Sequence, residues 1–138
     1  MPTLPTISQA AAIPLRGGRV CLITSRGGKR WVVPKGCLEP GKTAGQIALQ
    51  EAWEEAGLLG TLEREPIGSY AYEKFGNVYH VTAFVMEVTE ARVDWPESLE
   101  RDRIWLRPIS ALTRVDNLGL RRLMRKVLPA APAVTQAV

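Results

Sequence analysis

Apolar residues along much of the chain follow the spacing of β-strands. Residues 77–90 carry apolar side chains at both odd and even positions, which predicts a central strand with two buried faces. The stretches 7–16 and 19–25 are rich in aliphatic residues and flank Gly17 and Gly18, the pattern of a hairpin. The full set of predicted strands is 7–16, 19–25, 31–34, 61–73, 77–90 and 103–106.

Two stretches have the helical period instead. Residues 116–128 place leucines and Met124 on one face and basic residues on the other, which predicts an amphipathic helix after a helical turn at 108–112. Thr43 and Gln46 have the spacing of a capping box, so a second helix is expected to start at Ala44 and to end at Gly57. We expect one domain over 1–128 and a disordered tail over 129–138, because Pro129 cannot continue the last helix.

The helix that follows Thr43 carries a group of acidic residues. Glu51, Glu54 and Glu55 are three and four positions apart, so they share one side of that helix. Like charges at this spacing destabilise a helix by roughly a few tenths of a kcal/mol per pair. A divalent cation would remove the repulsion, and Mg²⁺ and Mn²⁺ prefer carboxylate and carbonyl oxygens. A solvated acidic helix face is the ordinary alternative.

These residues and their flanks resemble the Nudix box, G-x5-E-x7-R-E-U-x-E-E-x-G-U, in which U is aliphatic. Gly36 fills the first position, and residues 51–58 match the last block in spacing. The strand and turn over 30–36 are also similar to the segment that enters this box. The resemblance implies an α+β fold, a Nudix-type α/β/α sandwich with a mixed central sheet. Two positions depart: Lys42 replaces the first glutamate and Gln50 replaces the arginine.

The resemblance also implies roles for individual residues. The metal ligands would be Gly36, through its carbonyl, with Glu51, Glu54 and Glu55. Glu51 and Glu54 would be the catalytic carboxylates, with Glu54 acting as a ligand or as the general base. The basic residues expected near substrate phosphates are Arg26, Arg30, Lys35 and Lys42, and for the first three the alternative is a solvated loop position. Lys42 has further alternatives, since it could pair with a glutamate or stand in for a cation.

The implied activity is metal-dependent hydrolysis of a diphosphate linkage in a nucleoside diphosphate-type or polyphosphate compound. The flanks look most like the diphosphoinositol polyphosphate and diadenosine polyphosphate phosphohydrolases, which favours those substrate classes. The first strand lacks the lysines and arginine that these relatives use near highly charged substrates. Because Gln50 donates hydrogen bonds without charge, it would orient Glu51 less firmly than an arginine. The alternative is a catalytically weakened Nudix-fold module that binds a phosphorylated ligand.

The net charge and the composition indicate which classes of binding partner and which cell compartment to expect. The net charge of +4 suits a phosphate-containing small molecule, but it is too small and too scattered to indicate nucleic-acid binding. The chain has neither a membrane-length apolar stretch nor a secretory signal pattern, and its two cysteines fit a reducing compartment, so we expect a cytoplasmic protein. The single histidine, His80, is expected to be structural. A homodimer stays open, since Nudix proteins often dimerise.

Overall fold

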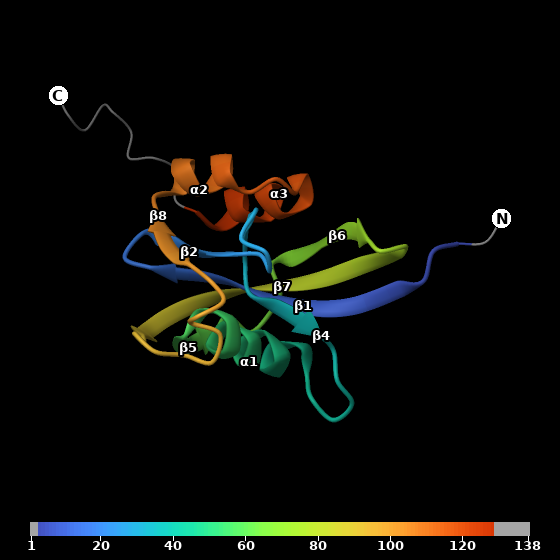
Figure 1. Cartoon of the computed structure of the whole chain (residues 1–138), viewed down its shortest axis with the longest axis horizontal. Helices are drawn as coiled ribbons and strands as arrows, with labels where there is room; N and C mark the ends of the chain where they lie inside the picture. Colours follow the sequence, from blue (N-terminus) through green and yellow to red (C-terminus); the bar gives the residue numbers. More distant parts are fainter. Residues whose placement is uncertain (1–2, 129–138) are drawn as a thin grey trace.

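The computed structural model describes residues 3–128, which form eight strands and three helices (Figure 1). In chain order these are β1 (Thr6–Arg16), β2 (Arg19–Thr24), β3 (Trp31–Val32), β4 (Lys35–Cys37), α1 (Ala44–Ala56), β5 (Leu58–Leu62), β6 (Gly68–Lys74), β7 (Asn77–Ala91), β8 (Arg103–Leu106), α2 (Pro108–Arg114) and α3 (Leu118–Val127). The residues 129–138, for which we predicted a tail, lie outside the described part of the chain.

All eight strands belong to one mixed sheet. Its main path runs β3-β2-β1-β7-β5, while β4 pairs with β1, β6 with β7, and β8 with β2. The pairing of β1 with β7 is parallel over ten residue pairs, and the other pairings are antiparallel. β7 has neighbours on both edges, which confirms its predicted central place.

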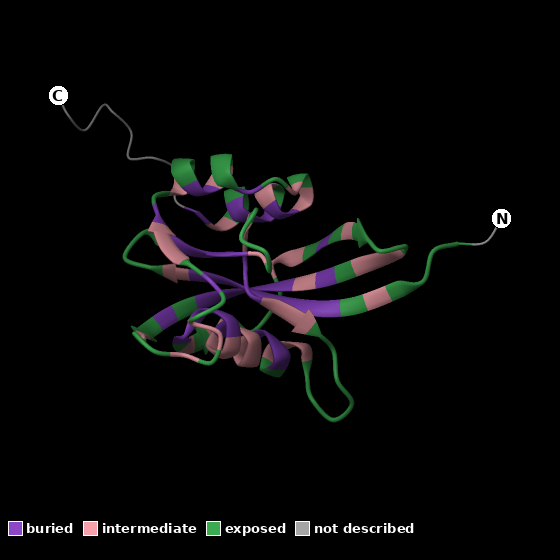
Figure 2. Ribbon diagram, viewed as in Figure 1, coloured by how far each residue is buried: buried purple, intermediate pink, exposed green. Residues whose placement is uncertain are grey.

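Helices cover both faces of this sheet, α1 on one side and α2 with α3 on the other (Figure 1). Because side chains alternate along a strand, β1 supplies both cores: Ala10 and Ala12 pack towards α1, and Ala11 and Ile13 pack towards α2 and α3. Figure 2 shows the buried residues concentrated along the middle of the sheet. The predicted α/β/α sandwich with a mixed sheet is therefore confirmed.

The local signals around α1 also hold. The Thr43 hydroxyl accepts from the Gln46 amide, and the Gln46 side chain accepts from the Thr43 amide, so both halves of the capping box form. Gly57 ends the helix in the left-handed region, at φ 68°. A Cβ at Gly57 would come 2.8 Å from the ring of Trp95, which packs on this end of the helix. The two caps set the ends of α1 and so place Glu51, Glu54 and Glu55 in its last two turns.

Several predicted boundaries were wrong: the strand expected over 31–34 ends at Val32, the helical turn expected over 108–112 extends to Arg114, and three further elements differ. The strand expected over 61–73 is two strands, β5 and β6, which pair with successive parts of β7. Glu63 and Ile67 still donate to the carbonyls of Val85 and Ala83, but the residues between them leave the ladder, and Pro66 has no N–H to give it.

The other two differences are shorter. Residues 35–37, expected to form a turn, make strand β4 against β1, with Gly36 opposite Ala10. Helix α3 starts at Leu118 because Asn117 is its N-cap and accepts from the Leu120 amide. Among the helices within residues 3–128, none is long and apolar enough to cross a membrane.

Candidate metal and phosphate site

The site begins where strand β4 crosses helix α1. Gly36 lies so close to the Glu51 side chain that a Cβ on the glycine would sit 2.5 Å from Glu51 Cδ and 2.8 Å from its Oε1. A side chain at position 36 would displace the Glu51 carboxyl, so the glycine lets that carboxyl lie directly against the backbone of β4. The Nudix-box spacing therefore has a steric meaning here: it brings the backbone of β4 and a carboxyl of α1 into one place.

Glu51 and Glu55 are one helical turn apart on α1, so their carboxyl groups are close enough to influence each other's ionisation. Burial and the Glu55 charge raise the pKa of Glu51 to about 8, with smaller contributions from Glu54 and Glu97. Burial also raises the pKa of Glu55, while Arg101 and the Lys35 amide and ammonium oppose that shift. With a pKa of about 8, the Glu51 carboxyl is largely protonated at neutral pH, while Glu55 has cations beside it that favour its charged form.

Glu55 is also the centre of a buried ionic network. Its Oε1 accepts from the Lys35 backbone amide at 3.1 Å, and its Oε2 lies 3.4 Å from a terminal nitrogen of Arg101. Arg101, which is 9% exposed, donates in addition to Glu97 Oε1 at 2.8 Å and to the Thr24 carbonyl at 2.9 Å. The network thus joins α1, the end of β2 and the loop over residues 92–102.

Aromatic and cationic side chains hold that loop against the end of α1. The Trp95 indole donates to the Glu55 carbonyl at 2.9 Å, and the Arg103 guanidinium stacks over the Trp95 ring at 4.3 Å. Arg103 also donates to the Ala56 carbonyl, one of the orphan acceptors at the helix end. Arg101 is therefore placed by a rigid framework, not by a free loop.

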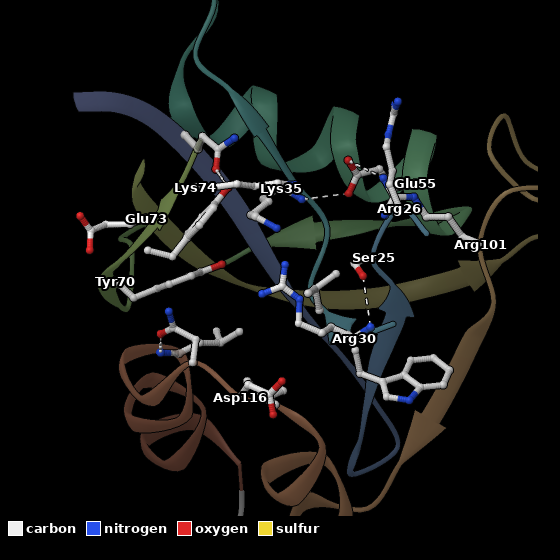
Figure 3. A pocket seen from close by; sticks show the side chains of 17 residues that line it. Ser25, Arg26, Arg30, Lys35, Glu55, Tyr70, Glu73, Lys74, Arg101 and Asp116 are labelled. Atoms are coloured by element: carbon white, nitrogen blue, oxygen red, sulfur yellow. Dashed lines mark hydrogen bonds and ion pairs between the residues drawn. The ribbon is translucent and has the colours of Figure 1, made fainter. Parts of the chain in front are cut away.

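Beside Glu55 opens a cavity of about 250 Å³ (Figure 3). Cations from four different segments line it: Arg26 and Arg30 from the β2–β3 loop, Lys35 from β4, Lys74 from β6, and Arg101 from the loop before β8. Ser25 closes the β2–β3 loop, since its amide donates to the Arg30 carbonyl at 2.7 Å and its hydroxyl accepts from the Arg30 amide at 3.2 Å. The cavity also has apolar and aromatic walls, which include Trp31, Tyr70, Tyr72, Val115 and Leu120.

Lys35 contacts Glu55 through its backbone amide, and its side chain lines the cavity. Burial lowers the pKa of its ammonium group, and the nearby Glu55 charge opposes that shift. The ammonium lies 5.3 Å from the centroid of the Tyr72 ring, a cation–π contact. Tyr72 in turn donates to Gln9 Oε1 at 2.7 Å and stacks on Tyr79, with ring centroids 4.8 Å apart. Lys35 is thus positioned to meet an anion between Glu55 and the tyrosines.

The structure brings together most of the residues that we predicted from the sequence. Arg26, Arg30, Lys35 and Glu55 line the cavity, and Glu51 with Gly36 lies next to Glu55. Glu54 is on the same helix, where its charge raises the pKa of Glu51 and its carbonyl accepts from the Glu97 amide. Within residues 3–128, however, no group of three acidic, histidine or cysteine side chains is arranged to hold a metal ion, so the predicted three-glutamate cluster does not stand ready-made.

Lys42 is separate from this site. Its ammonium donates to Gln50 Oε1 at 2.5 Å and lies 3.9 Å from Glu39 Oε1, and the Gln50 amide donates to Glu39 Oε2 at 3.4 Å. Lys42 thus contacts Gln50 and Glu39, on the exposed loop before α1, and makes no salt bridge with Glu51, Glu54 or Glu55 among the described residues. The side-chain amide of Gln50 donates its hydrogen bond to Glu39 and not to Glu51.

Sequence analysis missed Arg101, Gln9 and Tyr72. Arg101 stands among Glu97, Glu100 and Asp102, so it looked like one charge of a solvated loop. Gln9 is 8% exposed and directly precedes three alanines in β1, and a polar residue beside such an apolar run was an available signal. Tyr72 gave no signal of its own, because its role depends on the pairing of β6 with β7 and on Gln9 across the sheet.

The domain thus places a pair of carboxyl groups on helix α1 beside a cavity lined by cations. A family model for the NUDIX domain matches residues 6–129, so the chain belongs to the NUDIX domain family. It is 36% identical over 89 residues to Nudix hydrolase 17, mitochondrial, of Arabidopsis thaliana, covering 63% of this chain and 48% of that protein. It is also 36% identical over 111 residues to diphosphoinositol polyphosphate phosphohydrolase 3-alpha of Homo sapiens, covering 75% of this chain and 66% of that protein.

The chain spans about half the length of the plant relatives and about two thirds of the human one. The plant relatives are named mitochondrial, and the cytoplasmic location expected here stays a prediction. Among solved structures, a C. elegans Ap4A hydrolase in a binary complex superposes with a TM-score of 0.72 at 22% identity, covering 87% of this chain and 93% of that one. The E. coli ORF135 protein gives a TM-score of 0.67 at 22% identity, covering 97% of this chain and 94% of that one. At this identity these two likenesses concern the fold alone.

Proposed function

We propose that this protein is a metal-dependent hydrolase that cleaves a diphosphate linkage in a phosphate-containing small molecule. The observation that carries the proposal is the Glu51–Glu55 carboxyl pair held against Gly36, at the side of a cavity lined by Arg26, Arg30 and Lys35. The names of the relatives, which include Nudix and diphosphoinositol polyphosphate hydrolases, support the same reaction class.

The residues present fit a divalent cation. The two carboxyls offer hard oxygen ligands once Glu51 is deprotonated, and the backbone of Gly36, which lies against the Glu51 side chain, has a carbonyl that could add a further oxygen. Mg²⁺ is commonly held by one or two protein carboxylates together with substrate phosphate oxygens, so a ready-made group of three acids is not required. Glu51, Glu55 and the Gly36 carbonyl would hold Mg²⁺ or Mn²⁺, with Glu54 as a further ligand or as the general base.

When bound, such an ion stabilises negative charge on phosphate oxygens and lowers the pKa of water. The chain supplies the rest. Lys35, Arg26 and Arg30 neutralise phosphate oxygens in the cavity and orient the linkage against α1. Arg101 fixes the carboxylate of Glu55 through the buried network, and Glu54 is within the same helix turn to accept a proton from water.

The substrate class that the cavity favours is a dinucleoside polyphosphate. Its walls combine cations with tyrosine, tryptophan and aliphatic side chains, which suit a base as well as phosphates. A diphosphoinositol polyphosphate would place more phosphate charge against these apolar walls, and the cavity also contains Glu73 and Asp116, which repel anions. We therefore rank the dinucleoside compounds first and the inositol compounds second.

A second candidate function rests on Arg101. Its guanidinium lies 3.4 Å from Glu55 and so supplies a positive charge where the metal would otherwise do so. A protein whose glutamates are already neutralised in this way could bind a phosphorylated ligand through the cations of the cavity without hydrolysing it. The two functions differ in turnover and not in ligand chemistry.

The deciding experiment is a panel of diphosphate compounds with Mg²⁺ and with Mn²⁺, read by release of phosphate-containing products. The panel comprises dinucleoside polyphosphates, diphosphoinositol polyphosphates, nucleotide sugars and nucleoside triphosphates. We expect metal-dependent turnover that Glu55→Gln abolishes and that Glu63→Gln, an exposed glutamate between β5 and β6, leaves unchanged. Thermal stabilisation by a panel compound without turnover in either metal would instead establish the binding module.

Glu54→Gln separates the two roles left open for that residue. If Glu54 is the general base, the variant loses turnover but keeps its affinity for Mn²⁺. If Glu54 is a ligand, the affinity for Mn²⁺ falls together with turnover.

A further inference from the structure

The hairpin between β6 and β7 presents an aromatic ring in an unfavourable conformation. Phe75 has φ 51° and is 87% exposed, and among the described residues it is the one non-glycine residue with positive φ. It is followed by Gly76 at φ 76°, and Lys74 pairs with Asn77, so the two residues form the two-residue loop of the hairpin. A loop with positive φ at both positions favours Asn-Gly or Asp-Gly, and a bulky side chain there lowers folding stability.

The sequence therefore keeps a large apolar side chain where both the backbone and the solvent disfavour it. A strained residue of this kind is a sign that something other than folding selects it. Its ring does not pack into either core cluster, so it contributes nothing there to compensate.

The position of this ring relative to the cavity suggests its use. Tyr70, Tyr72 and Lys74 alternate along β6 and line the cavity, and Tyr79 of β7 stacks on Tyr72. The Lys74 ammonium lies 5.1 Å from the centroid of the Phe75 ring, and the Lys35 ammonium lies 5.3 Å from that of Tyr72. The same arrangement of a ring under a cation thus occurs twice, once at Tyr72 in the cavity and once at Phe75 in the hairpin loop, where the cation, Lys74, itself lines the cavity.

We propose that Phe75 is a stacking contact for the second base of a dinucleoside polyphosphate, whose first base lies in the cavity beside Tyr72. The two ammonium groups would then meet phosphates of the bridge between the bases. Base–aromatic stacking is tolerant of base identity, so Phe75 selects for a second base and not for a particular one. This inference rests on the proposed function, since it names the substrate class of the same site.

The test measures binding without metal, in EDTA, by isothermal titration calorimetry. Diadenosine tetraphosphate is compared with adenosine 5′-tetraphosphate, which has the same number of phosphates and one base fewer. We expect Phe75→Asn to weaken the dinucleotide about tenfold, within the range of base–aromatic stacking, and to leave the mononucleotide within about twofold. Phe75→Trp, which keeps an aromatic ring, should restore tight binding of the dinucleotide.

The control is Val93→Asn, which removes another apolar side chain, 86% exposed, from a loop away from the hairpin. It should change neither affinity. Thermal unfolding adds a second readout: Phe75→Asn should raise the melting temperature by about 3 °C, because asparagine suits this turn, while binding falls. A lowered melting temperature would show that the phenylalanine is not strained and would remove the argument.

Three results would overturn the inference. One is unchanged dinucleotide affinity in Phe75→Asn, and another is a wild-type protein that binds the dinucleotide no more tightly than the mononucleotide. The third is a homodimer that dissociates on Phe75→Asn in sedimentation, since the ring would then have a protein partner. A wild-type protein that binds as expected but hydrolyses nothing would refute the proposed hydrolase and leave the stacking contact standing.

Discussion

Two ionic networks contact helix α1, and they differ in how far their side chains are exposed to solvent. One, made by Lys42, Gln50 and Glu39, lies on the surface, where the Lys42 and Glu39 side chains are 43% and 48% exposed. The other, made by Arg101 with Glu55 and Glu97, is buried, with side chains that are 6%, 11% and 18% exposed. Both departures from the Nudix box fall in the exposed network.

The comparison teaches where such a motif tolerates change. Exposed ion pairs contribute little because water screens them, so a lysine and a glutamine can replace a glutamate and an arginine and still connect the loop to the helix. A buried network allows no such exchange, because removing one partner leaves a charge without compensation. The departures at Lys42 and Gln50 therefore change how the loop is fastened, while the Glu55 network that positions the site stays intact.

The largest expected effect is the loss of Arg101. Arg101→Met should lower the free energy of unfolding by about 3–5 kcal/mol, because Glu55 and Glu97 lose the cation between them in a buried place. The matched change on the surface, Lys42→Met, should cost about 0–1 kcal/mol. Urea denaturation of both variants makes the measurement. Equal effects would mean that burial does not distinguish the networks.

A smaller effect concerns pH. The pKa of Glu51 is raised to about 8 in the folded protein, so the folded state binds a proton that the unfolded state releases near pH 4.5. Stability from this group is fully present below about pH 4.5 and is lost as pH rises through about 8. The melting temperature of the metal-free protein should fall over this range, and Glu51→Gln, whose amide does not titrate, should flatten the curve. Parallel curves for both proteins would show that Glu51 does not carry the proton.

The smallest effect is a coupling within the exposed network. Gln50→Arg places a guanidinium beside the Lys42 ammonium and should destabilise the protein slightly, while Lys42→Glu with Gln50→Arg restores the pair of the Nudix box. A double-mutant cycle should give a coupling of about 0.5–1 kcal/mol. The double variant should also be at least as active as the wild type. A loss of activity would show that the present network orients Glu51 better than the box pair does.

Much of this molecule could be predicted from its sequence because the signals are local. The capping box at Thr43, the stop at Gly57 and the two-sided apolar strand β7 each depend on residues close together in the chain. The break between β5 and β6 could not be predicted, since it depends on which residues of β7 each segment pairs with.

The same distinction applies to the site. The glutamates of α1 and the cations of the β2–β3 loop were identified from spacing and resemblance. Arg101 lies 46 positions beyond Glu55 in the chain, and only the folded structure places its guanidinium 3.4 Å from that carboxylate. Tyr72 and Gln9 meet across 63 positions of the chain. Contacts of this range have no sequence pattern in a single chain.

The central claim is that Glu51 and Glu55 bind a divalent cation against Gly36. The most direct measurement is the titration of Mn²⁺ into the substrate-free protein by isothermal titration calorimetry at pH 8.5, which lies above the Glu51 pKa of about 8, so that this carboxyl is mostly deprotonated. We predict one bound ion, with an affinity that falls at least about tenfold in Glu51→Gln and in Glu55→Gln and stays unchanged in Glu63→Gln. A wild-type protein that binds no Mn²⁺, or a Glu51→Gln variant that binds it as tightly as the wild type, would contradict the account.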